Sequence, residues 1–432
     1  MQGEARRRRA RPRAARAGAV PGHEVGLGRF HELNKVSKGG QVWAGLESLV
    51  EEAMGRGVSP GVVLLVGRGE DVIYQRGWGR LGLGETPGAD SVVTPVTCFD
   101  LASLSKPLAT FASLVLLMAE GRLLLGQSVA DFFPGFGGVG PFAGAGAGGA
   151  SATVGQLLTH SSGLPDWVPY FKAPDFAAAG SQPFTFDKRR RRRLVAEVAR
   201  QPLVYEPGSE SRYSDLGFIL LGDIVEQITG EGLDEFITSR LLQPIGTGAG
   251  FRRPGSGVRG QDDAELAPCG ICGWRQRLVQ GQVQDENAWL MGGVAGHAGL
   301  FASARDIHLL AAEHEAALAG KSTLLDGRLL CHLLDAEPSV PGSTWLPGWD
   351  TPTPGASTAG SLVGARALGH LGYTGSSLWI DRDRGVHVVL LSNRVHPHTG
   401  NRGIAALRPA VHNAVFECVD SLSRQRSRKR AD

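Results

Sequence analysis

The position of the β-rich segments constrains this chain most, because they lie near both ends while helical patterns fill the middle. Residues 59–79 hold two β-branched runs around the turn GRGED, which is typical of a hairpin. Two further β-rich runs, Ser376 to Asp381 and Gly385 to Ser392, flank the turn DRDRG. The simplest arrangement is one antiparallel sheet built from both ends, with an inserted helical lobe. The sequence therefore predicts an α/β (α+β) fold.

Apolar spacing predicts the helices that accompany this sheet. Residues 40–57 show the period of an amphipathic helix that ends at a glycine, and residues 404–419 predict a closing helix. A buried helix is expected from Ser103 to Glu120, and another at 216–229 before Gly230.

The charge distribution separates a globular body from two basic ends. The chain of 432 residues has a net charge of +3, yet its first 28 residues contain seven arginines and its last nine contain five basic residues. The body between them is acidic overall. We expect basic tails at 1–28 and 421–432 and a single domain at 29–420, with a sheet subdomain at about 40–100 and 280–420 and a helical subdomain at about 101–279.

The arginine-rich tails allow two interpretations. They are either contacts for nucleic acid or another anionic surface, or disordered solvated ends that include a misassigned start codon. No aromatic interleaving accompanies them, so we favour the second and expect no nucleic-acid partner. Neither a signal-peptide h-region nor an apolar run long enough to span a membrane is visible, which favours a cytoplasmic protein. A wrong start codon would leave a periplasmic location open.

The cysteines and glycines suggest no metal or disulfide framework. The five cysteines are scattered and odd in number, as expected in a reducing compartment. Cys269 and Cys272 form a CxxC pair, but no second pair follows, so we expect neither a metal nor a redox role. The glycine-rich tract from Pro134 to Ser151 is predicted to be a flexible loop.

The stretch FDLASLSKPLAT, residues 99–110, places a serine and a lysine at the start of an apolar helix. A spacing of three brings Lys106 onto the same helix face as Ser103. Burial lowers the pKa of a lysine, so a neutral Lys106 would activate the Ser103 hydroxyl as a nucleophile. The Ser103 N–H would stabilise an oxyanion at the helix start. On these residues alone, a capping serine with a solvated lysine is an equal alternative.

Five segments together resemble a known family. FDLASLSK, LLTHSSGLP, YSDLGFILLG, GGVAGHAGLF and GHLGYTG are similar to the motifs of serine β-lactamases and penicillin-binding proteins. The resemblance covers residues 40–418 and is strongest to class C β-lactamases and their esterase and DD-carboxypeptidase-like relatives. It implies a β-lactamase/transpeptidase-like fold, a small-molecule or peptide substrate, and catalysis without a cofactor or metal.

The resemblance implies roles for the first two motifs. Ser103 corresponds to the family's nucleophile and Lys106 to its lysine. The second motif, Tyr-x-Asn in the class C branch, is here Tyr213-Ser-Asp215. It implies that Tyr213 is a general base and acid, since a nearby ammonium lowers the pKa of a phenol. Asp215 replaces the commoner asparagine and cannot donate a hydrogen bond when ionised, so three roles stay open: binding substrate, pairing with Lys106 and capping the following helix.

The family's third motif, Lys-Thr-Gly, corresponds to the letters HLG that begin at His370. The resemblance implies that His370 donates to a substrate carboxylate, although histidine is less fully charged than lysine at neutral pH. Gly372 and Gly375 would let a substrate backbone approach the strand. We expect a strand N–H between Tyr373 and Ser376 to be the second oxyanion donor.

Other polar residues of these segments are expected to be structural. His297 lies in GHAG, which a helical pattern follows, so it lines the pocket or supports the fold. His160 in LLTHSSGLP is expected to anchor a loop. The adjacent Asp285 and Glu286 suggest a loop clamp rather than a metal site, because the family needs no metal.

These observations predict a serine hydrolase that forms a covalent acyl-enzyme through Ser103, with Lys106 and Tyr213 moving the proton. The one G-x-S-x-G match, Gly57 to Gly61, leads from a predicted helix into a predicted strand rather than from a strand into a helix, which argues against an α/β-hydrolase elbow. The acyl group is left open among small esters, D-Ala-type peptides and β-lactams, with an esterase or amidase slightly favoured. The alternative is a slow-turnover penicillin-binding or sensor protein on the same fold. The sequence does not determine the oligomeric state.

Overall fold

The computed structural model describes residues 40–86, 88–138, 140, 142, 151–180, 184–255 and 266–431. The chain divides into two compact units, Met1–Gly40 and Gln41–Asp432, and the described residues belong almost entirely to the second. The predicted tail at 1–28 and much of the predicted glycine-rich loop lie outside the described residues.

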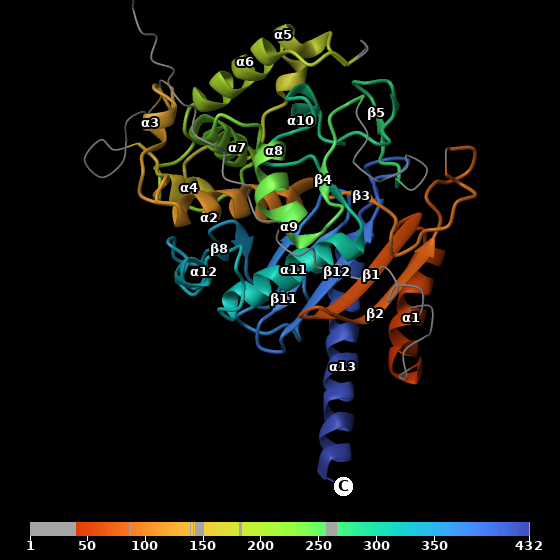
Figure 1. Ribbon diagram of the computed structural model, residues 1–432. Coiled ribbons are helices and arrows are strands. Elements are labelled where there is room, and N and C mark those ends of the chain that lie inside the picture. Colours follow the sequence, from red (N-terminus) through yellow and green to blue (C-terminus); the bar gives the residue numbers. More distant parts are fainter. Residues whose placement is uncertain are drawn as a thin grey trace, which may run out of the picture. The chain divides into compact units, whose positions relative to one another are not determined.

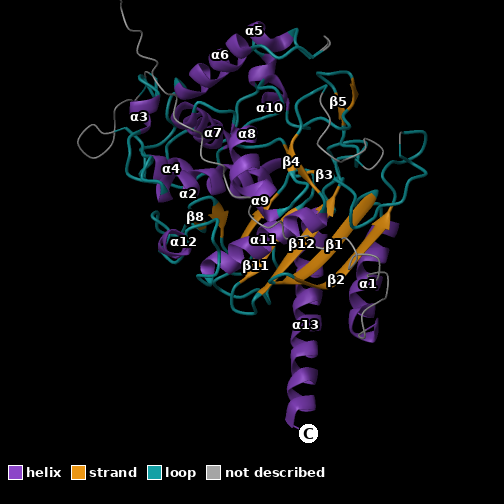
Figure 2. Cartoon of the chain, in the orientation of Figure 1, coloured by secondary structure: helices purple, strands orange, loops and turns teal. Residues whose placement is uncertain are grey.

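A seven-stranded antiparallel sheet forms the centre of this unit, in the order β2-β1-β12-β11-β10-β9-β8 (Figure 2). Its strands are β1 (Gly61–Arg68), β2 (Asp71–Gly79), β8 (Trp345–Leu346), β9 (Trp349–Asp350), β10 (Leu368–Leu371), β11 (Ser377–Asp381) and β12 (Val386–Ser392). The N-terminal hairpin joins the C-terminal one directly, because β1 pairs with β12 from Val62 opposite Ser392 to Gly67 opposite His387. The prediction of one antiparallel sheet built from both ends is confirmed.

Both faces of the sheet are covered, which explains the uninterrupted apolar runs of β1 and β12. Val62, Leu64 and Val66 of β1 share one core cluster with residues of α1 (Gly40–Gly55) and α13 (Ile404–Ala431). Val63 and Leu65 belong to a second, larger cluster that includes residues of α11 (Ala304–Leu318) and of the inserted lobe. Helix α11 lies across the sheet in Figure 1. Successive side chains of a strand point to opposite faces, so the central strands bury both rows.

The inserted lobe is mainly helical. Its helical elements are η2 (Ala102–Leu104), η3 (Lys106–Phe111), α2 (Ala112–Ala119), α3 (Val129–Phe132), α4 (Val154–Leu158), η4 (Tyr170–Lys172), α5 (Pro174–Ala177), α6 (Lys188–Ala199), α7 (Asp215–Thr229), α8 (Leu233–Ile237), η5 (Thr238–Leu242), α9 (Gln243–Ile245) and α10 (Glu286–Leu290), with α12 (Gly327–Leu334) after α11. Two small sheets accompany it, β3 (Phe99–Asp100) with β7 (Leu300–Ala302) and β4 (Gly250–Phe251), and β5 (Ile271–Cys272) with β6 (Arg277–Leu278).

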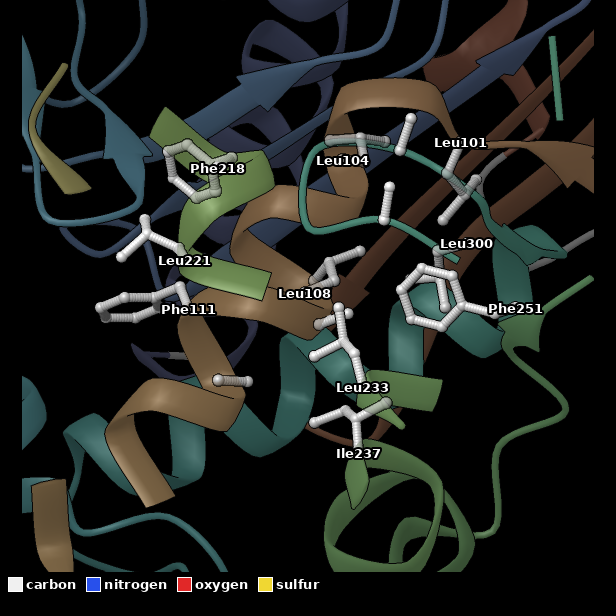
Figure 3. Packing of buried hydrophobic residues seen from close by; sticks show 14 of the residues in the cluster. Leu101, Leu104, Leu108, Phe111, Phe218, Leu221, Leu233, Ile237, Phe251 and Leu300 are labelled. Atoms are coloured by element: carbon white, nitrogen blue, oxygen red, sulfur yellow. The ribbon is translucent and has the colours of Figure 1, made fainter. Parts of the chain in front are cut away.

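The predicted helix from Ser103 is built from three successive elements instead of one regular helix. A 3-10 turn, η2, is followed by the π-helix η3 and then by α2. Leu104, Leu108 and Phe111 lie in one cluster with Phe218 of α7 and Leu300 of β7 (Figure 3). These contacts fix the segment in the core, where the packing of large side chains outweighs the preference for regular helix.

Two further findings differ from the sequence-based expectations. The stretch Ala102–Ala119 is long and apolar enough by composition to span a membrane, but 83% of it is buried inside the structure, so its side chains pack against protein. The predicted C-terminal tail is part of α13, which continues to Ala431 with exposed side chains at 423–428.

The two-sided burial of β1 generates a stability prediction. Leu64 is fully buried, whereas Leu124 is 68% exposed. We expect Leu64→Ala to lower the free energy of unfolding by about 2–5 kcal/mol, because it leaves a cavity between the sheet and its helices. Leu124→Ala, with the same chemistry, should change it by less than about 0.5 kcal/mol. Urea unfolding measures both, and equal effects would contradict the described packing.

Candidate active site

Ser103 and Lys106 lie together in the structure, as their spacing predicts. Ser103 is in the 3-10 turn η2, and Lys106 is the first residue of η3. The Lys106 Nζ lies 2.8 Å from the Ser103 Oγ, within hydrogen-bond distance. The irregular helix geometry therefore preserves the juxtaposition that a regular helix would produce.

The Lys106 side chain is completely buried among oxygen acceptors. Besides Ser103, its Nζ donates to the Tyr213 Oη and the Asp215 Oδ1, each at 2.6 Å, and to the His297 carbonyl oxygen at 3.2 Å. Burial disfavours the charged ammonium, but the charge of Asp215 and the neighbouring Tyr213 oppose this effect, and the pKa of Lys106 is raised. The neutral amine expected from burial alone is therefore wrong, because the ion pair keeps Lys106 protonated.

Asp215 reaches Lys106 from the start of α7. Ser214 is the N-cap of this helix, and its Oγ donates to the Pro165 carbonyl oxygen at 2.7 Å. Asp215 follows in the first turn, where the helix N–H groups favour a carboxylate. Its own N–H donates to the Asp166 carbonyl oxygen at 2.9 Å. Of the roles left open by the sequence, pairing with Lys106 is the one that the contacts show, while Ser214 supplies the cap.

Tyr213 comes just before this helix and brings its phenol to the centre of the cluster. The Lys106 Nζ lies 4.8 Å from the Tyr213 ring centroid, in addition to its hydrogen bond with the phenol oxygen. Burial raises the pKa of Tyr213 to about 12, with the charge of Lys106 opposing this rise and that of Asp215 adding to it. The resting cluster therefore holds an ammonium, a carboxylate and a neutral phenol.

A strained backbone position precedes the serine. Ala102 has a φ of +47°, in the left-handed region that costs an alanine about 1–2 kcal/mol. The buried Asp100 holds this conformation, since its Oδ1 accepts from the Ala102 N–H at 2.8 Å and its Oδ2 from the Gln284 N–H at 2.6 Å. Sequence reasoning missed Asp100, although an acid inside the apolar run FDLA was a visible signal. Strain held by neighbouring structure is typical of functional sites.

The third motif forms the tight turn between β10 and β11. Within it, the Gly372 N–H donates to the Ser376 carbonyl oxygen at 2.7 Å, and the Gly375 N–H donates to the Gly372 carbonyl oxygen at 3.0 Å. A Cβ on Gly372 would lie 2.6 Å from the Leu101 carbonyl oxygen, and Gly375 has a φ of +109°. A side chain at either position would therefore meet protein atoms or a strained backbone, so the glycines are needed to close the turn, and the approach of a substrate backbone stays a prediction.

The other two residues predicted for substrate contact differ in exposure. Tyr373 is 55% exposed, and the guanidinium of Arg394 lies 4.9 Å from its ring centroid. Ser376 is buried, and its Oγ has no hydrogen-bond partner in the described part of the chain. Tyr373 is thus open to a ligand, whereas Ser376 belongs to the buried side of the turn.

His370 carries a neutral ring. Its Nδ1 lies 2.9 Å from the Leu371 carbonyl oxygen, which only accepts, so Nδ1 holds the proton. Burial, and then the charge of Lys106, lower the pKa of His370 to about 3. Nε2 is therefore a lone-pair acceptor, and it has no partner among the described residues. The expected donation to a substrate carboxylate would require a proton on Nε2, which the neutral ring does not carry.

The rings of His160, Trp345 and His370 lie around the phenol of Tyr213. The His160 ring centroid lies 4.6 Å from that of Tyr213 and 4.5 Å from that of Trp345, and Trp345 lies 5.5 Å from His370. His160 also anchors its loop, as expected, because its Nδ1 accepts from the Ser214 N–H at 3.1 Å. Trp345 was missed because it stands in the irregular stretch GSTWLPGW, where no pattern marks it.

The predicted clamp at Asp285 connects to Lys106. The Asp285 Oδ1 accepts from the Ala288 N–H at 2.7 Å, at the start of α10, and lies 2.9 Å from the His297 Nε2. The carbonyl oxygen of His297 is in turn an acceptor for Lys106. His297 therefore supports the cluster through its backbone, and strand β7 separates it from the helix that the sequence predicts.

Comparison with known proteins shows the family to which the chain belongs. A sequence model of the family described as Beta-lactamase matches residues 46–412. A protein of Escherichia coli (strain K12) named "Putative D-alanyl-D-alanine carboxypeptidase" is 32% identical over 374 residues, which cover 78% of this chain and 79% of the relative. A protein of the same name from Salmonella typhi is 29% identical over 361 residues, which cover 79% and 80%.

Solved structures share the fold. EstCE1, described as a hydrolase with promiscuous acyltransferase activity, superimposes with a TM-score of 0.64 at 22% identity, covering 87% of this chain and 99% of its own. The octameric penicillin-binding protein homologue of Pyrococcus abyssi has a TM-score of 0.63 at 21% identity, covering 86% and 76%. The chain therefore belongs to the Beta-lactamase family and is a serine hydrolase.

Proposed function

We propose that Ser103 is the nucleophile of an acyl hydrolase that works through a covalent acyl-enzyme, with Lys106, Tyr213 and Asp215 as its proton-transfer cluster. The observation that carries the proposal is the single buried ammonium of Lys106, which lies within hydrogen-bond distance of both the serine and tyrosine oxygens. This contact gives the serine proton a route once the resting cluster has lost one proton, because a neutral Lys106 amine or a Tyr213 phenolate can then accept it.

The proposed reaction has two acyl-transfer steps. The Ser103 Oγ attacks the substrate carbonyl carbon, and its proton passes to the neutral Lys106 amine or the Tyr213 phenolate of a cluster that has lost one proton, while the carbonyl oxygen becomes an oxyanion. The Ser103 N–H and an N–H of the turn at 372–376 would hold that oxyanion. Collapse expels the leaving group, which takes the proton from the cluster. Water then attacks the acyl-serine ester by the same route and regenerates Ser103.

The charges of the cluster affect which substrates the site can bind. The ammonium of Lys106 is already paired with Asp215, and His370 is neutral, so neither offers a free positive charge to a substrate carboxylate. We therefore propose an ester or amide without a carboxylate at this position, such as a small ester. The names of the E. coli and Salmonella relatives favour D-alanyl-D-alanine peptides instead, and β-lactams are a third acyl donor for the same chemistry.

A second candidate is a slow-turnover penicillin-binding or sensor protein on the same fold. Asp215 favours it, because the carboxylate stabilises the protonated form of Lys106 and so weakens the cluster as a base for deacylation. Fluorescent penicillin and p-nitrophenyl acetate separate the two candidates. Ester turnover supports the hydrolase, whereas a stable penicillin adduct without turnover supports the sensor.

The nucleophile assignment predicts that Ser103→Ala abolishes covalent labelling and lowers ester turnover by at least about a thousandfold. A matched control is Ser113→Ala, which removes a buried hydroxyl whose only hydrogen bond within the described part of the chain is to the Ala109 carbonyl oxygen, at 2.8 Å in the same helical segment. It should keep both labelling and turnover. Intact-protein mass spectrometry and ester hydrolysis measure the two outcomes, and full turnover in Ser103→Ala would reject the assignment.

The charge of Asp215 predicts a shift in the pH profile. Activity should rise with pH as the cluster loses the proton that blocks its action as a base. Asp215→Asn removes a negative charge that raises the pKa of both Lys106 and Tyr213. The rise in kcat/KM should therefore move to lower pH by about one unit or more, whichever group accepts the proton. Asp166→Asn, at an exposed neighbouring carboxylate, should leave it in place, and a shift to higher pH in Asp215→Asn would contradict the charge argument.

The neutral ring of His370 predicts a change in substrate preference. His370→Lys would place an ammonium where the wild-type protein has an uncharged acceptor. We expect kcat/KM for an acyl-D-Ala-D-Ala peptide, relative to p-nitrophenyl acetate, to rise by about tenfold, because a charge-assisted contact to a carboxylate is worth about 1.5–3 kcal/mol. His370→Gln keeps the side chain neutral and should not raise the ratio. A preference for the peptide already present in the wild-type protein would reject the proposed substrate class.

A further inference from the structure

An arginine lies in the buried stripe of the C-terminal helix, beside the turn of the third motif. Arg408 belongs to α13 and is only 8% exposed. Its Nη2 donates to the carbonyl oxygens of Gly372 and Ser376, each at 2.9 Å, and its Nε donates to that of Gly375 at 3.2 Å. The hydrogen-bond acceptors of this guanidinium in the described part of the chain are carbonyl oxygens, with no carboxylate among them.

A buried guanidinium without a carboxylate is costly to a fold. Burial, followed by the charge of Arg394, lowers the pKa of Arg408 to about 10, which reflects this cost. An apolar side chain of similar length would dock the helix without it. Because burial of Arg408 is costly, we expect its guanidinium to have a role that an apolar side chain would not fulfil.

Donors occupy all five carbonyl oxygens of the turn at 372–376. Arg408 binds those of Gly372, Gly375 and Ser376, while the Arg394 Nη2 donates to that of Tyr373 at 2.6 Å. The fifth, at residue 374, accepts from the backbone N–H of Arg394 at 3.2 Å. The carbonyl groups of the turn thus point toward protein donors.

The orientation of the first peptide follows from these bonds. The Gly372 carbonyl oxygen accepts from both Arg408 and the Gly375 N–H, so its lone pairs are directed into the turn. In a trans peptide the N–H points opposite to the C=O, so the Tyr373 N–H points away from Arg408. The Cα of Gly372 faces the Leu101 carbonyl oxygen, two residues before Ser103. This arrangement sets the peptide against the segment that carries the nucleophile.

We propose that Arg408 is a positioning residue that fixes and polarises the Gly372–Tyr373 peptide, so that the Tyr373 N–H is the second oxyanion donor of Ser103. A guanidinium on a carbonyl oxygen withdraws electron density through the amide and makes its N–H a stronger donor. The buried charge also stabilises the negative charge that develops on the substrate oxygen. This inference deepens the proposed function and rests on it.

The test compares variants of two arginines that join a β-turn to the same helix. Arg408→Met removes the donors and keeps an apolar chain of similar length. The matched control is Arg384→Met, because Arg384 links the turn after β11 to α13 through Asp420 at 2.9 Å. Each protein is measured for ester kcat and KM, for the affinity of methylboronic acid, and for thermal unfolding. Boron accepts a lone pair from the Ser103 Oγ and becomes a tetrahedral anion, while the serine proton passes to the cluster.

We expect Arg408→Met to lower kcat by about ten- to a hundredfold, with KM changed less than about threefold, because only the oxyanion loses stabilisation. The affinity for methylboronic acid should fall by a similar factor. Arg384→Met should lower the unfolding temperature without changing kcat or the affinity for methylboronic acid. If Arg408→Met does not fold, Arg408→Lys, which cannot reach three carbonyl oxygens at once, should show a smaller loss of the same kind.

Two results would overturn the inference. Unchanged kcat and boronate affinity in a folded Arg408 variant would show that the arginine only docks the helix, as would a rise in KM alone. Labelling of wild-type Ser103 by a fluorophosphonate separates this failure from that of the proposed function. If the wild-type protein neither labels at Ser103 nor hydrolyses the ester, the proposed function is rejected. If it does both, and Arg408→Met has the same kcat and boronate affinity as the wild-type protein, only the inference about Arg408 is rejected.

Discussion

The buried ammonium of Lys106 is the interaction on which the rest of the site depends. A charge without access to water must be surrounded by acceptors, and these come from three separate parts of the chain: the serine turn, the start of α7 and the loop at His297. Each acceptor is a constraint on where its segment lies. The lysine is therefore both part of the proton-transfer cluster and the group that draws its elements together.

The core supports this cluster by making the surrounding backbone irregular and rigid. Large apolar side chains hold the η2–η3 segment, while Asp100 bonds the strained Ala102 to the Gln284 loop. The Thr374 side chain donates to the carbonyl oxygen of the same aspartate at 2.8 Å. Asp100 thus links the turn of the third motif to the backbone beside the nucleophile. Placement of this kind allows an oxyanion to meet donors that need no rearrangement.

Substitutions of the family motifs change the charge balance of the site. The carboxylate of Asp215 pairs with the Lys106 ammonium and raises the pKa of Tyr213, and the buried His370 offers an acceptor where a lysine would offer a charge. Both changes act through burial, because the same groups in water would interact weakly. The charge state of the site in this chain therefore depends on Asp215 and on the burial of His370.

Periodicity and motif spacing in the sequence were sufficient for the two-ended sheet, the hairpin around GRGED, α7 with its glycine stop, and the pairing of Ser103 with Lys106. Each of these features depends on local patterns or on strands whose apolar composition predicts that they are buried. Only the tertiary structure decided that Lys106 stays charged, that His370 is neutral, and that Arg408 and Asp100 hold the turn and the serine segment. These properties depend on which distant side chains share a buried volume, and the protonation and bonding of a buried group follow from those neighbours.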